Sequence, residues 1–245
     1  MLINADVKSL EVVTAAYLSQ DRILCSEVRD GVDFHELNQR RFNLPSRTIA
    51  KIFKFKLIYG AQAWGYAHDS DFIDVSTDQT FWQKVIDEYY RKYSGMRGWH
   101  NTLIQDAIKL GVYKSPTGRI YSYPAQDVAV RNWFWRPKIL NYPVQGLGAD
   151  LVMLARISFW NRLKSLNYWE FVKLCSSVHD SIVVDVDNSK ELCYTISKML
   201  KECVEEVPTL FKKHFNLEFN LPLSAEVKIG KDLKNMEVYR FAGNY

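Results

Sequence analysis

The stretch RTIAKIFKFKLIYG, residues 47–60, places its polar and aromatic side chains at a helical spacing. The residues that stand four apart are Arg47, Lys51, Phe55 and Tyr59. On an α-helix each such step advances about 6 Å along the axis and about 40° around it. The spacing therefore predicts a helix carrying a row of side chains that is cationic at one end and aromatic at the other.

Positive charge is concentrated around this predicted helix. Residues 39–60 contain six Lys or Arg residues and no Asp or Glu, although the formal net charge of the whole chain is +4. Such a helix is either a solvated basic face or a site that binds a polyphosphate at its cationic end and stacks a base at its aromatic end. The choice depends on whether the chain also supplies acidic ligands for metal ions.

Length and composition indicate a globular protein. The chain has 245 residues, of which 47% are hydrophobic and 14% aromatic, so it can bury the core of one large domain or two modest ones. The amino-terminal segment MLINADVKSLE acquires charges before an apolar run develops, and no later window approaches a membrane span. We therefore expect a cytoplasmic protein with no membrane partner.

Two aspartates are expected at the ends of strands. Residues 2–5 predict a strand that ends at Asp6, and strand ends are where open sheets place ligands. The sequence LCSSVHDSIVVDV predicts a strand, a tight turn and a second strand, with Asp180 at the tip. A polar triplet between two β-forming arms favours a site over a core. Glu11, on the helix predicted after Asp6, would ordinarily form a salt bridge.

Further elements follow from local patterns. Asp33 and Ser46 each precede a helical stretch and are predicted N-caps, and His35 lies in the first turn after Asp33. Turn residues followed by alternating positions at 115–123 predict a hairpin that carries Arg119. The remaining predicted elements are helices within 9–21, 81–109, 151–166 and 189–204, and a strand at 221–227.

Two stretches have opposite preferences for a polyanion. Residues 69–88 carry six acids against Lys84 alone, which predicts an outward face turned away from polyanions. The segment NYPVQGLGAD, residues 141–150, places Gln145 beside Gly146. Small residues there allow close approach either by a packed helix or by a nucleic-acid strand.

These segments resemble those of family A DNA polymerases. Asp6 with Glu11 resembles the first signature of the family, RTIAKIFKFKLIYG the second, and VHDS the third, which usually reads VHDE. DFHEL and NYPVQGLGAD also resemble family segments in the expected order. Each signal is weak alone, but their correct order from residue 6 to residue 181 makes them specific together.

The resemblance implies an α+β fold in which a right-hand polymerase palm with an antiparallel sheet carries a largely helical fingers subdomain. We expect palm segments at 1–30 and 136–245 and fingers at 31–135. In the family the thumb and the N-terminal part of the palm precede the first Asp. We therefore expect a split polymerase, in a bacterial cell or a phage-infected host, whose second polypeptide carries thumb, N-terminal palm and possibly an exonuclease.

The implied activity is template-directed 5′→3′ DNA synthesis from dNTPs on primer–template DNA, catalysed with two Mg²⁺ ions. By resemblance the metal ligands are Asp6, Asp180 and the backbone carbonyl of Val7, and Lys51 is a candidate proton donor to the leaving pyrophosphate. The implied nucleotide-binding residues are Arg47, Lys51, Phe55, Tyr59, His35 and Glu11. The implied DNA contacts are Gln145, His179, Asn141, Arg119 and Arg136.

Two other functions stay open. Single-subunit RNA polymerases share the palm and the cationic row but are not expected to carry Glu11, which in the DNA enzymes crowds a 2′-hydroxyl. A catalytically silent DNA-binding or scaffold subunit would retain the shape of a polymerase. Two convergent carboxylates argue against it, because their repulsion calls for a metal ion.

The chain also departs from the family pattern. Lys54 and Lys56 replace an Asn and a Gly around Phe55, and we expect them to strengthen phosphate attraction or to serve an interface. Ser181 stands where a Glu is usual, which removes an accessory carboxylate and is expected to lower activity.

Overall fold

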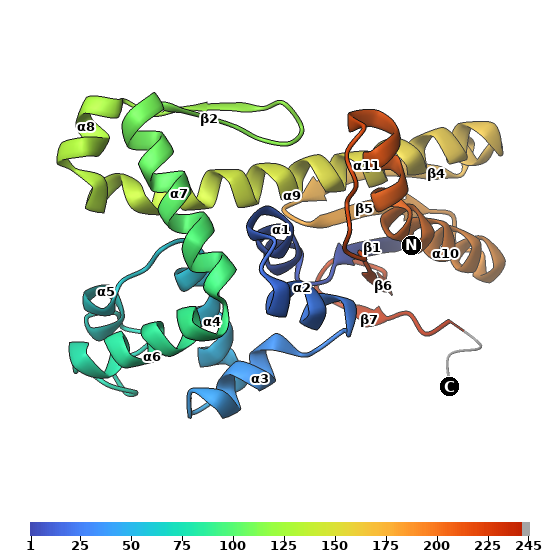
Figure 1. The fold of residues 1–245 in the computed structure, drawn as a ribbon. Coiled ribbons are helices and arrows are strands. Elements are labelled where there is room, and N and C mark those ends of the chain that lie inside the picture. Colours follow the sequence, from blue (N-terminus) through green and yellow to red (C-terminus); the bar gives the residue numbers. More distant parts are fainter. Residues whose placement is uncertain (242–245) are drawn as a thin grey trace. The chain divides into compact units, whose positions relative to one another are not determined.

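The computed structural model describes residues 1–241, without the side chains of residues 125 and 132–134 (Figure 1). The chain divides into two compact units. Unit 1 comprises residues 1–10 together with the chain from residue 147 onward, and unit 2 comprises residues 11–146. The boundaries expected at residues 30 and 135 therefore lie inside unit 2, and the names palm and fingers stay predictions.

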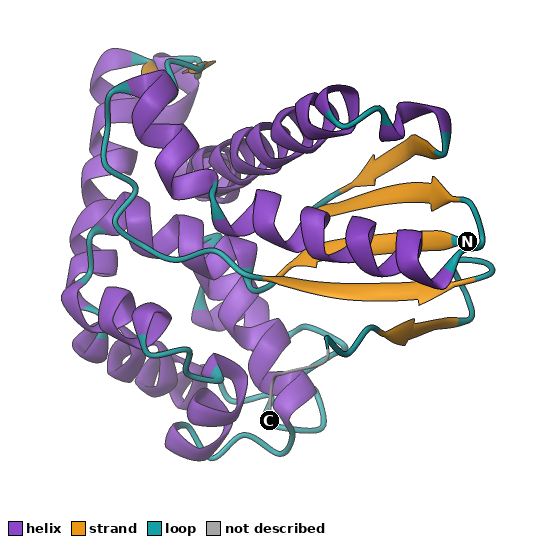
Figure 2. Ribbon diagram, turned by 90° about the vertical axis from the view of Figure 1, so that its right-hand side faces the viewer, coloured by secondary structure: helices purple, strands orange, loops and turns teal. Residues whose placement is uncertain are grey.

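Unit 1 is built on a five-stranded antiparallel sheet with the strand order β4-β5-β1-β6-β7 (Figure 2). Its strands are β1 (Leu2–Val7), β4 (Val172–Val178), β5 (Ser181–Val186), β6 (Ala225–Gly230) and β7 (Met236–Val238). The antiparallel palm-like sheet and the β4–β5 hairpin are thus confirmed. The strand expected at 221–227 begins only at Ala225, because Pro222 has no amide hydrogen for a ladder.

One face of this sheet is covered by α10 (Lys190–Glu205), which packs across β5, β1 and β6 (Figure 2). The helix begins after Ser189, whose side chain caps it, and its buried residues recur every three or four positions. In β1 the alternate residues Ile3, Ala5 and Val7 are buried. Asp6 therefore points to the other face of the sheet. The helix α11 (Val207–Phe215) follows α10.

Unit 2 is helical apart from one hairpin. Its helices are α1 (Leu10–Ser19), α2 (Arg22–Arg29), α3 (Phe34–Arg41), α4 (Arg47–Ile58), α5 (Ala63–Ala67), α6 (Gln79–Lys92), α7 (Ser94–Leu110) and α8 (Ala125–Val130). Asp33 and Ser46 cap α3 and α4, as predicted. The strands β2 (Val112–Lys114) and β3 (Ile120–Ser122) form the predicted hairpin.

An aromatic core fixes which face of α4 is buried. Phe53 is fully buried and its ring lies within 5.1–6.4 Å of the rings of Tyr66, Trp82 and Tyr89. The hydroxyl of Tyr66 donates to the carbonyl of Phe53 at 2.8 Å. Since Phe53 and Leu57 face this core, the row that begins with Arg47 lies on another side of the helix.

The longest helix begins earlier than expected. α9 (Asn132–Ser165) runs without a break through Pro137 and Pro143, from unit 2 into unit 1. A proline inside a helix costs about 3 kcal/mol, which predicts a boundary there. Here Ile139 and Leu140 are fully buried against α7 and α8, and that burial offsets the cost. The helix ends before η1 (Tyr168–Glu170).

Within the described part of the chain, no helix has the length and apolar content that crossing a membrane requires.

Candidate active site

Asp6 and Asp180 lie together on the sheet of unit 1. β1 pairs with β5 in a register that places Asp6 opposite Ser181. The amide of Val7 donates to the carbonyl of Asp180 at 2.9 Å, and the two carboxyl side chains share a hydrogen bond. Two acids that are far apart in sequence therefore meet at the end of one strand pair.

The electrostatics of this carboxyl pair favour a cation. Burial, followed by the charge of Asp180, raises the pKa of Asp6 to about 6. Lys228 lowers this pKa and Glu226 raises it. Crowded carboxylates are neutralised by a hard divalent cation, and oxygen donors are the ligands that Mg²⁺ prefers. The donor chemistry therefore fits magnesium. Among residues 1–241, no three or more His, Cys, Asp or Glu side chains are grouped to hold a metal.

Sequence reasoning missed the two β6 residues that flank the pair. Glu226 lies opposite Asp6 in the ladder and Lys228 lies opposite Asn4, and their side chains form an ion pair at 3.0 Å. The alternation in AEVKIG would have placed both on one face. Their register against β1 depends on a long-range strand pairing that no local pattern contains.

The β4–β5 turn is formed by His179 and Asp180. His179 is exposed and has a positive φ of 54°. The hydroxyl of Ser181 donates to the carbonyl of Val178 at 3.0 Å, so the residue that replaces the usual Glu closes the turn. Asp180 is thereby held at the hairpin tip, as predicted.

The cationic row on α4 in unit 2 has the predicted helical geometry. Arg47 is not free, since its Nε and Nη2 atoms bind the carboxylate of Asp33 at 3.0 and 2.9 Å. The Nζ atom of Lys51 lies 5.7 Å from the ring centroid of Phe55. In the described residues Lys51 makes no ion pair, so its charge is available to an anion.

His35 is buried, and its ring lies 5.8 Å from that of Phe55. Burial, followed by the charges of Lys54 and Arg47, lowers the pKa of His35 to about 4. The imidazole is therefore neutral at pH 7. If it contacts a phosphate, as the resemblance implies, it does so as a hydrogen-bond donor and not as a cation.

Three predicted site residues meet at the end of α4. The side-chain amide of Gln145 donates to the hydroxyl of Tyr59. Burial, followed by the charge of Glu11, raises the pKa of Tyr59 to about 12. Glu11, Tyr59 and Gln145 thus form one polar group from three distant segments, and Gln145 holds Tyr59 besides its predicted contact with DNA.

Two glycines beside this group are required by close packing. Gly60 has a φ of 81°, and a Cβ atom there would lie 2.5 Å from Leu140 Cδ1. A Cβ atom on Gly146 would lie 1.6 Å from the hydroxyl of Tyr121. Of the two explanations for the small residues at Gly146, packing is therefore the one that the fold supports.

The other predicted DNA contacts in unit 2 lie near these residues. Arg136 Nε donates to the carbonyl of Gly60 at 3.3 Å. Asn141 lies on α9, with its Oδ1 atom buried. Arg119 follows the β2–β3 turn, where its amide donates to Ser115 Oγ at 3.0 Å. Their contacts with DNA stay predictions.

Comparison with known proteins decides the family. A family model described as DNA polymerase family A matches residues 1–235. The chain belongs to this family. One relative of this family A chain is the thermostable DNA polymerase I of Thermus aquaticus, which is 25% identical over 242 residues. That match covers 95% of this chain and 27% of the relative. The thermostable DNA polymerase I of Thermus filiformis is 27% identical over 244 residues, with the same coverage of 95% and 27%.

A solved structure confirms the fold of the family A chain. The POL domain of Pol1 from M. smegmatis, in complex with DNA primer-template and dNTP, matches with a TM-score of 0.77 and 22% identity. The match covers 94% of this chain and 39% of that one. The chain spans about a quarter of the length of the curated relatives it matches.

The two extra lysines of this family A chain both contact other residues of unit 2. Lys56 forms ion pairs with Asp69 and with the exposed Asp71, so two residues of the acidic stretch bind this lysine. Lys54 is fully buried, its Nζ atom has no hydrogen-bond partner in the described residues, and it lies 3.7 Å from the ring centroid of Phe34. Burial lowers its pKa well below the ordinary value. Full burial keeps Lys54 from contacting a phosphate, while the expected role of Lys56 in phosphate attraction or at an interface stays a prediction.

We expect Lys54→Met to raise the free energy of unfolding by about 1–2 kcal/mol at pH 7, because it removes a buried amine that has no hydrogen bond and keeps the side-chain length. Urea denaturation followed by circular dichroism measures the change. Lys56→Met is the matched control and is expected to lose up to about 1 kcal/mol with its ion pairs. A Lys54→Met protein less stable than the wild type would contradict the prediction.

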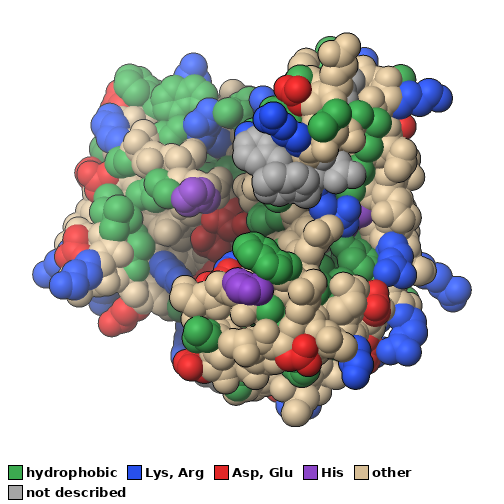
Figure 3. Space-filling model, turned by 90° about the vertical axis from the view of Figure 1, so that its left-hand side faces the viewer, with side chains coloured by type: hydrophobic (Ala, Val, Ile, Leu, Met, Phe, Trp, Pro, Cys, Tyr) green, Lys and Arg blue, Asp and Glu red, His purple; other side chains and the backbone are tan. Residues whose placement is uncertain are grey.

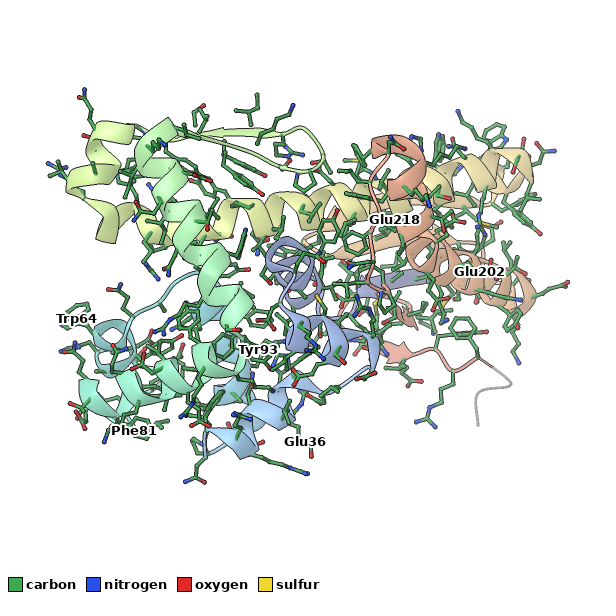
Figure 4. All side chains as sticks on the ribbon, viewed as in Figure 1. Glu36, Trp64, Phe81, Tyr93, Glu202 and Glu218 are labelled. Carbon is green, nitrogen blue, oxygen red and sulfur yellow. The ribbon has the colours of Figure 1, made fainter. Side chains whose placement is uncertain are left out.

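A polar pocket beside the end of α4 was not anticipated from the sequence. Its volume is about 310 Å³, and its lining includes Gln62, Trp64, Arg97 and Arg136. Trp64 projects from α5 and is 63% exposed, with its ring stacked on His68 at 4.5 Å (Figure 4). An exposed tryptophan among cations and amides suits a nucleobase. On the face drawn in Figure 3, acidic, basic and apolar side chains are interspersed, so charge alone does not mark a binding site there.

Proposed function

We propose that this chain carries the metal-binding and nucleotide-binding residues of a DNA polymerase that synthesises DNA in the 5′→3′ direction on a primer–template. The observation that carries the proposal is the contact between Asp6 and Asp180, two carboxyls whose proximity raises the pKa of Asp6. A silent scaffold has no use for such a pair, because like charges in contact destabilise a fold unless a cation neutralises them.

In unit 1, the carboxylates of Asp6 and Asp180 and the backbone carbonyl of Val7 would hold two Mg²⁺ ions. When bound, these ions would supply the positive charge that phosphoryl transfer requires at the attacking and leaving oxygens. His179, exposed at the same hairpin tip, would contact the primer strand. The Glu226–Lys228 ion pair would hold the position and charge of Asp6.

In unit 2, α4 would bind the incoming dNTP. Arg47 and Lys51 would bind the triphosphate, with neutral His35 donating a hydrogen bond, and Lys51 would pass a proton from its ammonium group to the leaving pyrophosphate. Phe55 and Tyr59 would stack at the nascent base pair. The residues proposed to contact DNA are Arg119, Arg136, Asn141 and Gln145, together with Trp64 and Arg97 of the polar pocket.

Glu11 would select deoxynucleotides, and it lies close enough to Tyr59 to raise the pKa of that tyrosine. We expect Glu11→Ala to reduce the preference for dCTP over CTP, as a ratio of kcat/KM values, by about 10–100-fold. The exposed Glu36→Ala is the matched control and should leave the ratio unchanged. If ribonucleotide use does not rise in Glu11→Ala, RNA synthesis becomes the better interpretation.

The proposed function is tested by extension of a labelled primer. The experiment is to purify this chain with and without the product of a neighbouring reading frame and to measure extension by each preparation. We expect template-dependent extension that requires Mg²⁺. No extension by either preparation would count against the polymerase proposal.

A further inference from the structure

A contiguous apolar surface on unit 1 has no role in the proposed function. On α9, Met153, Ile157 and Trp160 follow one another at steps of four and three residues, which places them on one stripe of the helix. Trp169 and Phe171, at and just after η1, are exposed as well. Each of these five side chains is between 37% and 49% exposed. Single exposed apolar residues are ordinary, but a contiguous group marks an interaction site.

The stripe borders a cleft of about 580 Å³ at the start of β4. Its apolar lining consists of Ile157, Trp160, Trp169, Val172 and Leu174. β4 is the terminal strand of the sheet and pairs on one side only, with β5. The volume lies within the range of sites that seat a few side chains of a bound ligand. The cleft can therefore hold two or three apolar side chains of a partner.

The charge around this cleft is predominantly positive. Between residues 151 and 178 the chain has four Lys or Arg residues and one acid, Glu170. Arg162 is occupied by ion pairs with Glu202 and Glu206 on α10 and just beyond it. The other three, Arg156, Lys164 and Lys173, make no ion pair within residues 1–241. Arg156 and Lys173 line the cleft, and Lys164 Nζ lies 5.1 Å from the ring centroid of Trp160.

We propose that this cleft binds an acidic segment of a partner protein, which seats aromatic or aliphatic side chains on Trp160 and Trp169 and places carboxylates beside Arg156, Lys164 and Lys173. Unpaired cations next to an apolar floor complement such a segment in both charge and shape. A second copy of the chain fits poorly, because a symmetric contact would bring the same cations together. The inference stands on these residues and does not depend on the carboxyl pair.

The test measures binding of a fluorescein-labelled peptide of twelve residues, composed of alternating aspartate with leucine or tryptophan, by fluorescence anisotropy. Two matched peptides carry asparagine for aspartate, or alanine for leucine and tryptophan. We expect each matched peptide to bind at least about tenfold more weakly, which corresponds to 1.4 kcal/mol. Lys164→Glu, Lys173→Glu and Trp169→Ala should each lower the affinity for the acidic peptide by a similar factor.

Lys234→Glu and Leu233→Ala are matched controls, since both residues are exposed in unit 1 outside the cleft, and they should leave the affinity unchanged. Three results would overturn the proposal. One is equal binding of the acidic and asparagine peptides. Another is an oligothymidine that displaces the peptide and loses affinity in the same variants, which would make this a nucleic-acid surface. The third is concentration-dependent dimerisation, seen by sedimentation, that Trp169→Ala abolishes.

Discussion

Asp6→Asn and Asp180→Asn are each expected to lower the rate of nucleotide incorporation by at least about 10³-fold, equivalent to about 4 kcal/mol in activation free energy. Each change removes one of the two negative charges that would hold the metal ions, while an amide keeps the shape of the side chain. Single-turnover primer extension, with the product of the neighbouring reading frame present if extension requires it, measures the rate. Asp187→Asn, an exposed aspartate that follows the other end of β5, is the matched control and should retain activity.

Stability provides a readout of the same pair that does not depend on activity. The pKa of Asp6 is raised from 3.8 to about 6, so between these values the folded protein binds more protons than the unfolded chain. In the presence of a chelator, wild-type stability should therefore fall as the pH rises from about 4 to about 6 and stay lower above that range. The full shift corresponds to at most about 3 kcal/mol, and partial solvent screening reduces this to about 1–2 kcal/mol.

The neutral amide of Asp6→Asn removes this cost, so the variant should be the more stable protein at pH 7 when metal is chelated. Added Mg²⁺ should stabilise the wild type and not the variant, since it binds a charge that the variant lacks. Urea denaturation at several pH values, with chelator or with Mg²⁺, measures both effects. Unchanged incorporation in both aspartate variants, or the same response of wild type and Asp6→Asn to pH and Mg²⁺, would contradict the assignment of the pair.

Local sequence patterns predicted the elements that carry the candidate site, because neighbouring residues determine where these elements form. The four-residue spacing from Arg47 predicts α4, the oxygen of Ser46 caps it, and β-forming arms around Asp180 predict the hairpin. The position of Asp6 beside Asp180 was a hypothesis drawn from two strand ends. The strand register confirms that they meet.

What the sequence did not predict depends on contacts between distant segments. Two prolines inside α9 indicate a helix boundary unless the burial of Ile139 and Leu140 is known. A lysine beside a cationic row looks like a phosphate ligand, yet Lys56 binds acids outside its own helix. The bond from Gln145 to Tyr59 joins α9 to the end of α4. These are tertiary contacts between segments that are far apart in sequence, and local residue spacing carries no information about them.

Lys51→Met is expected to lower kcat/KM for the incoming dNTP by about 10²–10³-fold. The row has two cations, Arg47 and Lys51. Lys51 makes no ion pair in the part of the chain that the structure describes, so its charge is available to a triphosphate. Arg47 already binds Asp33, and Arg47→Met should raise KM by only about tenfold, with a smaller change in kcat. Steady-state kinetics on a fixed primer–template measure both constants.

Lys51→Arg separates the two roles proposed for this lysine. A guanidinium keeps the positive charge but does not give up its proton, so the variant should recover most of the dNTP affinity lost in Lys51→Met while kcat stays low. Lys56→Met, whose lysine is paired with Asp69 and Asp71, is the matched control and should change neither constant by more than about twofold. If Lys51→Arg restores kcat in full, proton donation by Lys51 is wrong. If Lys51→Met leaves both constants unchanged, α4 does not bind the triphosphate through this residue.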